Sequence, residues 1–280
     1  QHLVISGGEP FLRDDLPAIV AYARERGIDS VDVLTNGTAV TPEKLADIAP
    51  YVGRVSVSFD GPNAEAAPVI RREPLFDRLV AVKMIREAGI QPHIIPTAHG
   101  GNIDALGEYV ALADSLGATM NFSLLSAPVE NEDLSAVLPD DAALERLAQA
   151  TLALSRDGVP VLSDTPVSTR LTTTCGCGAG CTMVSVSADG EVFPCHMMHD
   201  EAFSLGSLLE DSGCLAARHA PAPRVAELGA CADCDIRYLC GGGCRARAYF
   251  ATGDVEARDP YCSLVRTFYR LLFEAMLARN

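Results

Sequence analysis

The sequence contains no tryptophan, and only 6% of its residues are aromatic. Basic residues are also few, because 22 Lys and Arg stand against 37 Asp and Glu, which gives a formal net charge of −15 at pH 7. This acidic balance argues against nucleic acid as a partner, since phosphate backbones attract basic surfaces. No apolar run approaches the roughly 18 residues that a membrane-spanning helix needs. We therefore expect a soluble protein that has no membrane partner.

The sequence shows no secretory signal of the kind that accompanies many disulfide-rich proteins. Its 280 residues nevertheless contain ten cysteines. These thiols could pair as disulfides, but a chain that is 48% hydrophobic buries a sizeable core and does not need them for stability. We favour metal ligation by cysteine in a reducing, cytoplasmic compartment.

The densest group of cysteines is Cys231-Ala-Asp-Cys234, followed by Cys240-Gly-Gly-Gly-Cys244 and then by Cys262. Two residues between the first pair let both sulfurs approach one metal centre, and the glycines let the chain bend closely around an inorganic core. This spacing predicts a site for soft metal, most simply an iron–sulfur cluster.

Further cysteines lie upstream. Cys175, Cys177 and Cys181 occupy a glycine-rich segment, and Cys195 follows them. Their number indicates a second cluster. Cys214 has a simpler interpretation as a small buried hydrophobic residue.

From residue 1 to about 165, short β-branched segments alternate with amphipathic ones. The pattern predicts strands at Leu3–Ser6, Val31–Thr35, Arg54–Phe59, His93–Thr97 and Met120–Leu125. It predicts helices at Asp14–Arg26, Pro42–Ala49, Phe76–Ala88, Ile103–Leu116 and Asp140–Ser155. Repeated βα units imply a parallel sheet, either open or closed as a barrel.

Polar turns follow four of these strands. They are Ser6-Gly-Gly-Glu-Pro10, Thr35-Asn-Gly37, Ser58-Phe-Asp-Gly61 and Pro96-Thr-Ala-His99. Ligands bind at the carboxyl edge of parallel strands, so the turns predict one small-molecule site. We expect His93, His99 and Asn102 to line the same mouth.

At about residue 166 the regular helical periodicity gives way to cysteine, glycine and proline. This change of composition predicts two domains, at 1–165 and 166–280. Asp189-Gly190 is a strong turn signal between apolar runs and indicates a hairpin, and a helix is expected at Ser263–Leu277. Because the second domain has little regular structure, bound metal should supply part of its folding energy.

Taken together, Gly7-Gly8-Glu9-Pro10, the Ser58 turn and the spacing of the cysteines resemble the radical S-adenosylmethionine (SAM) enzymes that carry a C-terminal SPASM domain. The resemblance implies an α/β fold, a partial (β/α)6 TIM-like barrel followed by a small cysteine-rich iron–sulfur domain. It also implies a maturase that crosslinks or oxidises a ribosomally made peptide after a 5′-deoxyadenosyl radical abstracts a hydrogen. An electron donor such as flavodoxin or ferredoxin is an implied partner.

The resemblance further assigns a set of residues to SAM binding, namely Gly7, Gly8, Glu9, Pro10, Asn36, Ser58, Asp60 and Arg71. A carboxylate and backbone carbonyls suit the ammonium group of the cofactor. The planar guanidinium of Arg71 suits its carboxylate, although Arg71 and the adjacent Arg72 could equally be surface charges.

For the cysteines, the resemblance implies two auxiliary [4Fe–4S] clusters. The outer cluster would be held by Cys231, Cys234, Cys240 and Cys262. The inner cluster would take Cys195 and Cys244 together with upstream cysteines. Spacing leaves two alternatives for the upstream ligands, either Cys175 with Cys181 or Cys177. His196 beside Cys195 is a candidate catalytic base, or simply part of a loop over the cluster.

Other functions stay open. Within the same enzyme class the substrate could be a tetrapyrrole or a protein side chain. The alternative from another class is a non-catalytic module that binds peptide. In such a module the same thiolates would bind zinc, which would stabilise the fold.

One feature of the family is missing from the sequence. No Cys-x3-Cys-x2-Cys loop, the motif that holds the SAM-cleaving cluster, occurs in the 280 residues. We expect that loop, and the strand before it, in a segment that precedes Gln1.

The first prediction follows from this difference. On reduction in the presence of SAM, the 280-residue chain alone should release no 5′-deoxyadenosine, because it has no ligands for the cleaving cluster. Chromatography of the reaction mixture checks the expectation, and detection of this product would contradict it.

Overall fold

The computed structural model describes residues 1–59, 75–126, 134, 136–156, 162, 165–209 and 222–278. The chain forms two compact units. One comprises Gln1–Leu125 and Leu154–Ser163, and the other comprises Ser126–Ala153 and Asp164–Asn280. Asp60, Arg71 and Cys214 lie outside the described residues, so the structure does not describe these three sites.

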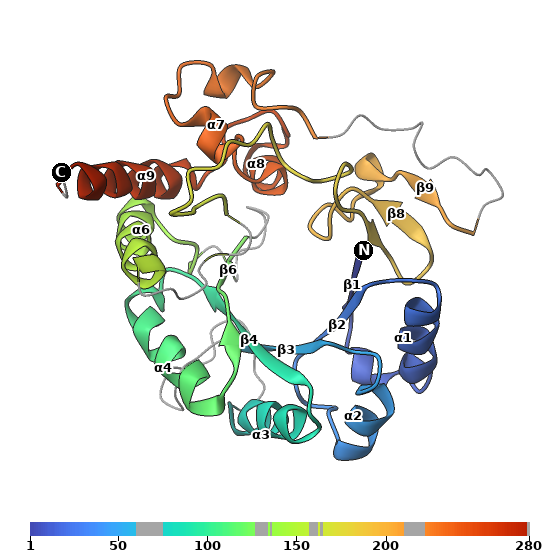
Figure 1. The fold of residues 1–280 in the computed structure, drawn as a ribbon. Helices are drawn as coiled ribbons and strands as arrows, with labels where there is room; N and C mark the ends of the chain where they lie inside the picture. The colour runs from blue at the N-terminus through green and yellow to red at the C-terminus, as the bar shows by residue number, and fades with distance from the viewer. Residues whose placement is uncertain are drawn as a thin grey trace. The chain divides into compact units, whose positions relative to one another are not determined.

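The first unit is built on a parallel sheet (Figure 1). Its strands β1 to β5 lie in chain order, and β6 pairs with β4. The strands are β1 (His2–Ile5), β2 (Ser30–Thr35), β3 (Arg54–Phe59), β4 (Gln91–Ala98), β5 (Thr119–Met120) and β6 (Ser123–Leu124). Every pairing in this sheet is parallel.

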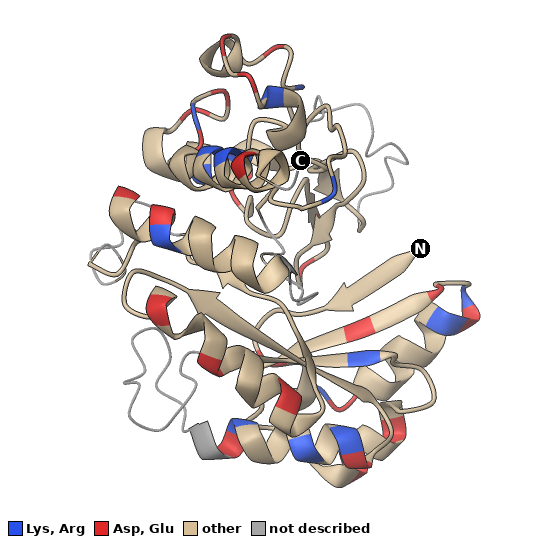
Figure 2. Cartoon of the chain, turned by 60° about the vertical axis from the view of Figure 1, so that its left-hand side comes forward, with Lys and Arg blue, Asp and Glu red and all other residues tan. Residues whose placement is uncertain are grey.

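The connections between the strands are helical. They contain α1 (Leu16–Glu25), α2 (Pro42–Ile48), α3 (Leu75–Glu87) and α4 (Leu106–Leu116), with the short 3₁₀ turns η1 (Pro10–Leu12) and η2 (Ile103–Ala105). On α1 the buried residues Leu16, Val20 and Ala23 recur at helical spacing. Figure 2 shows Lys and Arg interspersed with Asp and Glu along the helices. The predicted α/β class, a parallel sheet of the partial-barrel type followed by a cysteine-rich region, is confirmed.

The two faces of the sheet differ in polarity. Ser56 and Ser58 alternate along β3 with Val57, so they point to the opposite face. A Cβ atom at Gly37 would lie 3.3 Å from both Val57 and Ala81 of α3. Val57 therefore faces the covering helices, and Ser56 and Ser58 face the other side of the sheet.

One predicted strand is wrong in part. The segment expected as Met120–Leu125 is divided into β5 and β6. At the break, the side-chain oxygen of Asn121 accepts a hydrogen bond of 2.7 Å from Nε2 of His93.

The second unit contains a small antiparallel sheet and short helices. The sheet consists of β7 (Ser185–Val186), β8 (Glu191–Phe193) and β9 (Gly206–Ser207), which confirms the predicted hairpin. The helical elements are α6 (Asp141–Arg156), whose last residues fall in the first unit, η3 (Glu201–Phe203), η5 (Gly229–Cys231), α7 (Arg237–Cys240), α8 (Arg245–Thr252) and α9 (Cys262–Leu277). Among the described residues, no helix is both long enough and apolar enough to cross a membrane.

Candidate functional site

The loop after β1 presents its backbone at the carboxyl edge of the sheet. Gly7 has φ +87° and Gly8 has φ +49°, and both residues are exposed. An added Cβ atom at either position would meet no atom within 4 Å. Glycine is therefore favoured here by the left-handed backbone conformation, not by a lack of space.

Glu9 ties this loop to the neighbouring strand. Its carboxylate accepts hydrogen bonds from the Thr35 hydroxyl at 2.7 Å and from the backbone N–H of Asn36 at 2.8 Å. It also accepts one from the backbone N–H of Phe11 at 3.1 Å. A carboxylate has about four acceptor positions, so one position is left for a ligand. The sequence pattern did not predict this structural role, since Thr35 lies far from Glu9 along the chain.

The remaining sheet-edge residues are placed as follows. Asn36 forms a local turn, because its side-chain oxygen accepts hydrogen bonds of 2.8 Å from both the backbone N–H and the hydroxyl of Thr38. Pro10 is buried and begins η1. Ser58 lies near the end of β3 on the face turned away from α3, and it is 8% exposed. The structure thus gathers Gly7, Gly8, Glu9, Pro10 and Asn36 around one pair of strand ends, with Ser58 on the next strand.

The expectation that His93 lines the mouth is wrong. His93 is the third residue of β4, in the amino-terminal half of the strand, and it is hydrogen-bonded to Thr119 at 2.8 Å as well as to Asn121. Its burial lowers the pKa of the imidazole. His99 and Asn102 do follow the carboxyl end of β4, but both are buried, and Asn102 accepts a hydrogen bond from the His99 backbone.

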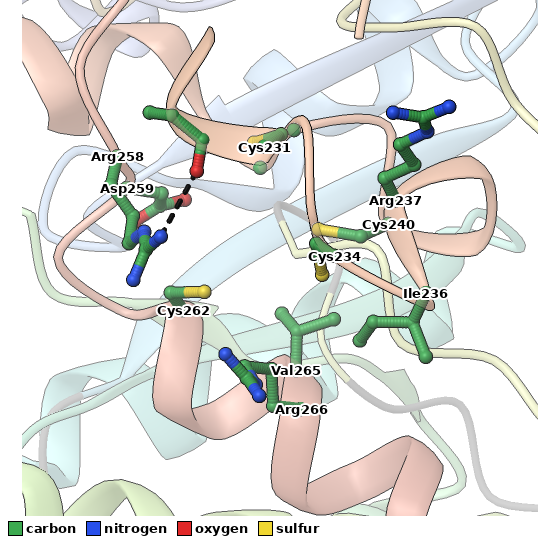
Figure 3. Close-up of a pocket in the computed structure, with 13 residues that line it drawn as sticks. Cys231, Cys234, Ile236, Arg237, Cys240, Arg258, Asp259, Cys262, Val265 and Arg266 are labelled. Atoms are coloured by element: carbon green, nitrogen blue, oxygen red, sulfur yellow. Dashed lines mark hydrogen bonds between the residues drawn. The ribbon is translucent and has the colours of Figure 1, made fainter. Parts of the chain in front are cut away.

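In the second unit, four cysteines surround one cavity that is partly open to solvent (Figure 3). Cys231 ends η5, Cys240 ends α7 and Cys262 begins α9. Cys234 follows η5, where its N–H donates to the Cys231 carbonyl at 3.1 Å. We call this site the four-cysteine cavity. Its four thiols are those that the sequence grouped as the outer set.

Two thiols of this cavity, those of Cys240 and Cys262, lie in a medium that disfavours their charged form. Burial, and then the charges of Cys262, Asp259 and Cys231, raise the pKa of Cys240 to about 12. Burial also raises the pKa of Cys262. Without a cation these groups hold their protons, so metal binding must release protons and stabilise thiolates.

The glycine run next to the cavity is required by sterics. Gly241, Gly242 and Gly243 have φ values of +68°, +88° and +75°. A Cβ atom at Gly243 would lie 2.4 Å from the Asp259 carboxylate, and one at Gly241 would lie 2.8 Å from the side chain of Thr174. The chain can pass between Cys240 and Cys244 along this path only without side chains.

A second group of cysteines lies in an apolar cluster of the same unit. Cys195 is buried there together with Ala179 and Met198, and Cys177 and Cys244 pack against it. Burial raises the pKa of the Cys244 thiol, and the charge of Cys177 acts in the same direction. The structure therefore brings Cys177 together with Cys195 and Cys244.

Cys175 and Cys181, the alternative upstream pair, are both exposed. His196 is exposed as well, and its Nδ1 lies 3.6 Å from the sulfur of Cys195. The backbone N–H of Met197 also points to this sulfur, at 3.5 Å. These contacts place His196 in the loop that covers Cys195.

Four thiols line one cavity, next to a backbone segment without side chains. Four thiolates suit the soft core of an iron–sulfur cluster, and the same donor set could also hold a tetrahedral zinc ion.

Comparison with known proteins agrees with this architecture. The model of the Radical SAM superfamily matches residues 1–113. Mycofactocin maturase MftC of Mycolicibacterium smegmatis is 31% identical, over 92% of this chain and 69% of the relative. AdoMet-dependent heme synthase of Methanosarcina barkeri is also 31% identical, over 93% of this chain and 81% of the relative. The solved structure "Native anSMEcpe with bound AdoMet and Kp18Cys peptide" is 16% identical and has a TM-score of 0.77, over 99% of this chain and 84% of that chain.

The chain belongs to the radical SAM superfamily. The parallel sheet and the glycine-rich loop after its first strand agree with this membership.

The contacts of Glu9 lead to the second prediction. Glu9→Gln should lower the free energy of unfolding of the first unit by about 1–3 kcal/mol, because an amide cannot accept all three hydrogen bonds at full strength. Urea denaturation followed by circular dichroism measures the loss. Glu25→Gln on the exposed end of α1 is the matched control, and equal effects of the two substitutions would contradict a positioning role for Glu9.

Proposed function

We propose that this enzyme is a maturase that modifies a ribosomally made peptide by crosslinking or oxidising it. The observation that carries the proposal is the combination of the Glu9 loop with two cysteine groups in a chain that is 31% identical to a mycofactocin maturase over most of its length. The anSMEcpe structure, whose fold is similar, holds a bound peptide together with AdoMet.

At the sheet edge, the chain's own residues would bind and orient SAM, which supplies a 5′-deoxyadenosyl radical when an iron–sulfur cluster reduces it. The backbone carbonyls of the Gly7–Gly8 loop and the free acceptor position of Glu9 suit its ammonium group. Ser58, on the neighbouring strand, suits a ribose hydroxyl. We assign Asp60 and Arg71 to the same cofactor from the family resemblance alone.

In the second unit, Cys231, Cys234, Cys240 and Cys262 would hold one auxiliary [4Fe–4S] cluster. Cys177, Cys195 and Cys244 would bind three of the four irons of a second auxiliary [4Fe–4S] cluster. Cys175 or Cys181 would be its fourth ligand. These clusters would accept or pass one electron, and a flavodoxin or ferredoxin would be the outside donor. The exposed His196 is a weak candidate for a proton acceptor near the inner cluster.

A tetrapyrrole substrate is the second candidate. The heme synthase relative matches this chain at the same identity as the maturase and over a larger share of its own length. The sheet edge and the cysteine groups would serve either substrate, so the distinction depends on the substrate itself.

The experiment uses the full-length enzyme with all of its clusters, SAM and a reductant. Incubation with the small peptide encoded beside its gene should remove two hydrogens per modification, which mass spectrometry detects. An unchanged peptide together with a modified porphyrin would shift the function to tetrapyrrole chemistry. If neither substrate changes although 5′-deoxyadenosine forms, both proposals fail.

The cluster assignment gives a further prediction. The anaerobically reconstituted chain should bind about eight irons, and Cys234→Ala should bind about half as many, because one set loses a ligand. Cys214→Ala, which removes a cysteine from neither set, is the control. Colorimetric iron analysis and the visible charge-transfer absorption give the readout, and a full iron content in Cys234→Ala would contradict the assignment.

A further inference from the structure

Two arginines at the start of α8 are buried almost completely. Arg245 is 1% exposed and Arg247 is 2% exposed. A guanidinium keeps its charge at any accessible pH, and a charge removed from water needs an opposite charge nearby. The two residues meet this requirement differently.

Arg247 has a counter-charge within the unit. Its Nε and Nη2 atoms donate to the two carboxylate oxygens of Asp259 at 3.1 and 2.9 Å. The side chains are 2% and 6% exposed, so this pair is dry and carries no net charge. Its guanidinium also lies 5.0 Å from the ring centroid of Tyr261.

Arg245 has no such partner. Its Nη1 atom donates to the carbonyls of Val255 and Ala257 at 2.8 and 2.9 Å, and Nη2 donates to the carbonyl of Gly242. Its Nε atom is buried and has no hydrogen-bond partner in the described part of the chain. No described carboxylate forms an ion pair with it. Carbonyl dipoles leave the positive charge of Arg245 uncompensated.

The guanidinium of Arg245 is hydrogen-bonded to residues that line the four-cysteine cavity or adjoin its lining. Gly242, which receives the Nη2 bond, lines that cavity. Ala257, which receives an Nη1 bond, comes just before Arg258 and Asp259, two residues that also line it. The missing negative charge is therefore expected on this side of the guanidinium.

We propose that Arg245 is the counter-charge of the iron–sulfur cluster in the four-cysteine cavity and raises its reduction potential. A [4Fe–4S] core with four thiolates is anionic, and reduction adds another negative charge. A fixed positive charge in a dry interior stabilises the reduced form more than the oxidised form. The inference rests on the cluster assignment proposed above and adds a role for a residue that is not a ligand.

The reduction potential is the direct test. The signal of this cluster is the one that Cys234→Ala removes, and a redox titration followed by electron paramagnetic resonance measures its midpoint. Arg245→Gln should disfavour one-electron reduction at least tenfold, which is a shift of about 59 mV to more negative potential. Arg270→Gln on α9 is the control, because Arg270 is exposed and does not line the cavity, so water and salt screen its charge. Equal shifts in the two variants would overturn the proposal.

Arg245→Gln also loses hydrogen bonds, so a second comparison separates charge from structure. Arg245→Lys keeps the charge with fewer donors, and it should retain the iron content and a potential close to that of the unaltered chain. If both Arg245 variants lose the iron of the four-cysteine cavity, the guanidinium acts through its hydrogen bonds and the proposal is overturned. Iron missing from the unaltered chain would instead contradict the cluster assignment itself.

Discussion

The cysteine-rich unit depends on the carboxylate of Asp259. One oxygen accepts hydrogen bonds from Arg247 and from the backbone N–H of Cys244 at 2.6 Å, and the other accepts from Arg247 and from the backbone N–H of Tyr261 at 2.9 Å. The Asp259 carbonyl also accepts a hydrogen bond from the N–H of Cys262 at 3.0 Å. A single residue thereby fixes the backbone of one cysteine from each group. A buried charge with this many donors is strongly held, and its removal would leave Arg247 unpaired in a dry interior.

This arrangement explains how neighbouring cysteines serve different sites. Cys240 lines the four-cysteine cavity, whereas Cys244 packs with Cys177 and Cys195. The left-handed glycines reverse the chain between them, and the hydrogen bond from Cys244 to Asp259 holds the new direction. One short segment thus contributes cysteines to two separate groups, through a backbone that accepts no side chains.

Much of the first unit could be predicted from the sequence because local pattern decides it. Alternating β-branched residues located β1 to β4, and the polar turns marked the carboxyl edge. Position within a strand was harder to judge. The strand containing His93 begins two residues earlier than expected, at Gln91, so His93 falls away from the mouth. The hydrogen bond between Glu9 and Thr35 could not be predicted from the sequence either, because it depends on strand register and not on local spacing.

In the second unit the thiols expected to share one site do line one cavity, but the sequence left the grouping of the upstream cysteines open. Spacing alone allowed Cys175 with Cys181 as readily as Cys177, and only packing favours Cys177. The burial of Arg245 and Arg247 had no sequence signal, since two arginines in one helical turn usually indicate a solvated face. Their environment follows from the long-range return of the segment around Asp259 to the start of α8.

The glycine run also bears on how this protein can change over time. At Gly241, Gly242 and Gly243 any side chain would be strained by its backbone angle and would strike Thr174, Leu228 or Asp259. Every missense mutation at three successive codons is therefore expected to be harmful. Natural variation in the cysteine-rich unit is therefore expected elsewhere. A saturation-mutagenesis map of this chain should show these three glycines as a block that tolerates no substitution, even in a screen that reports only on folding.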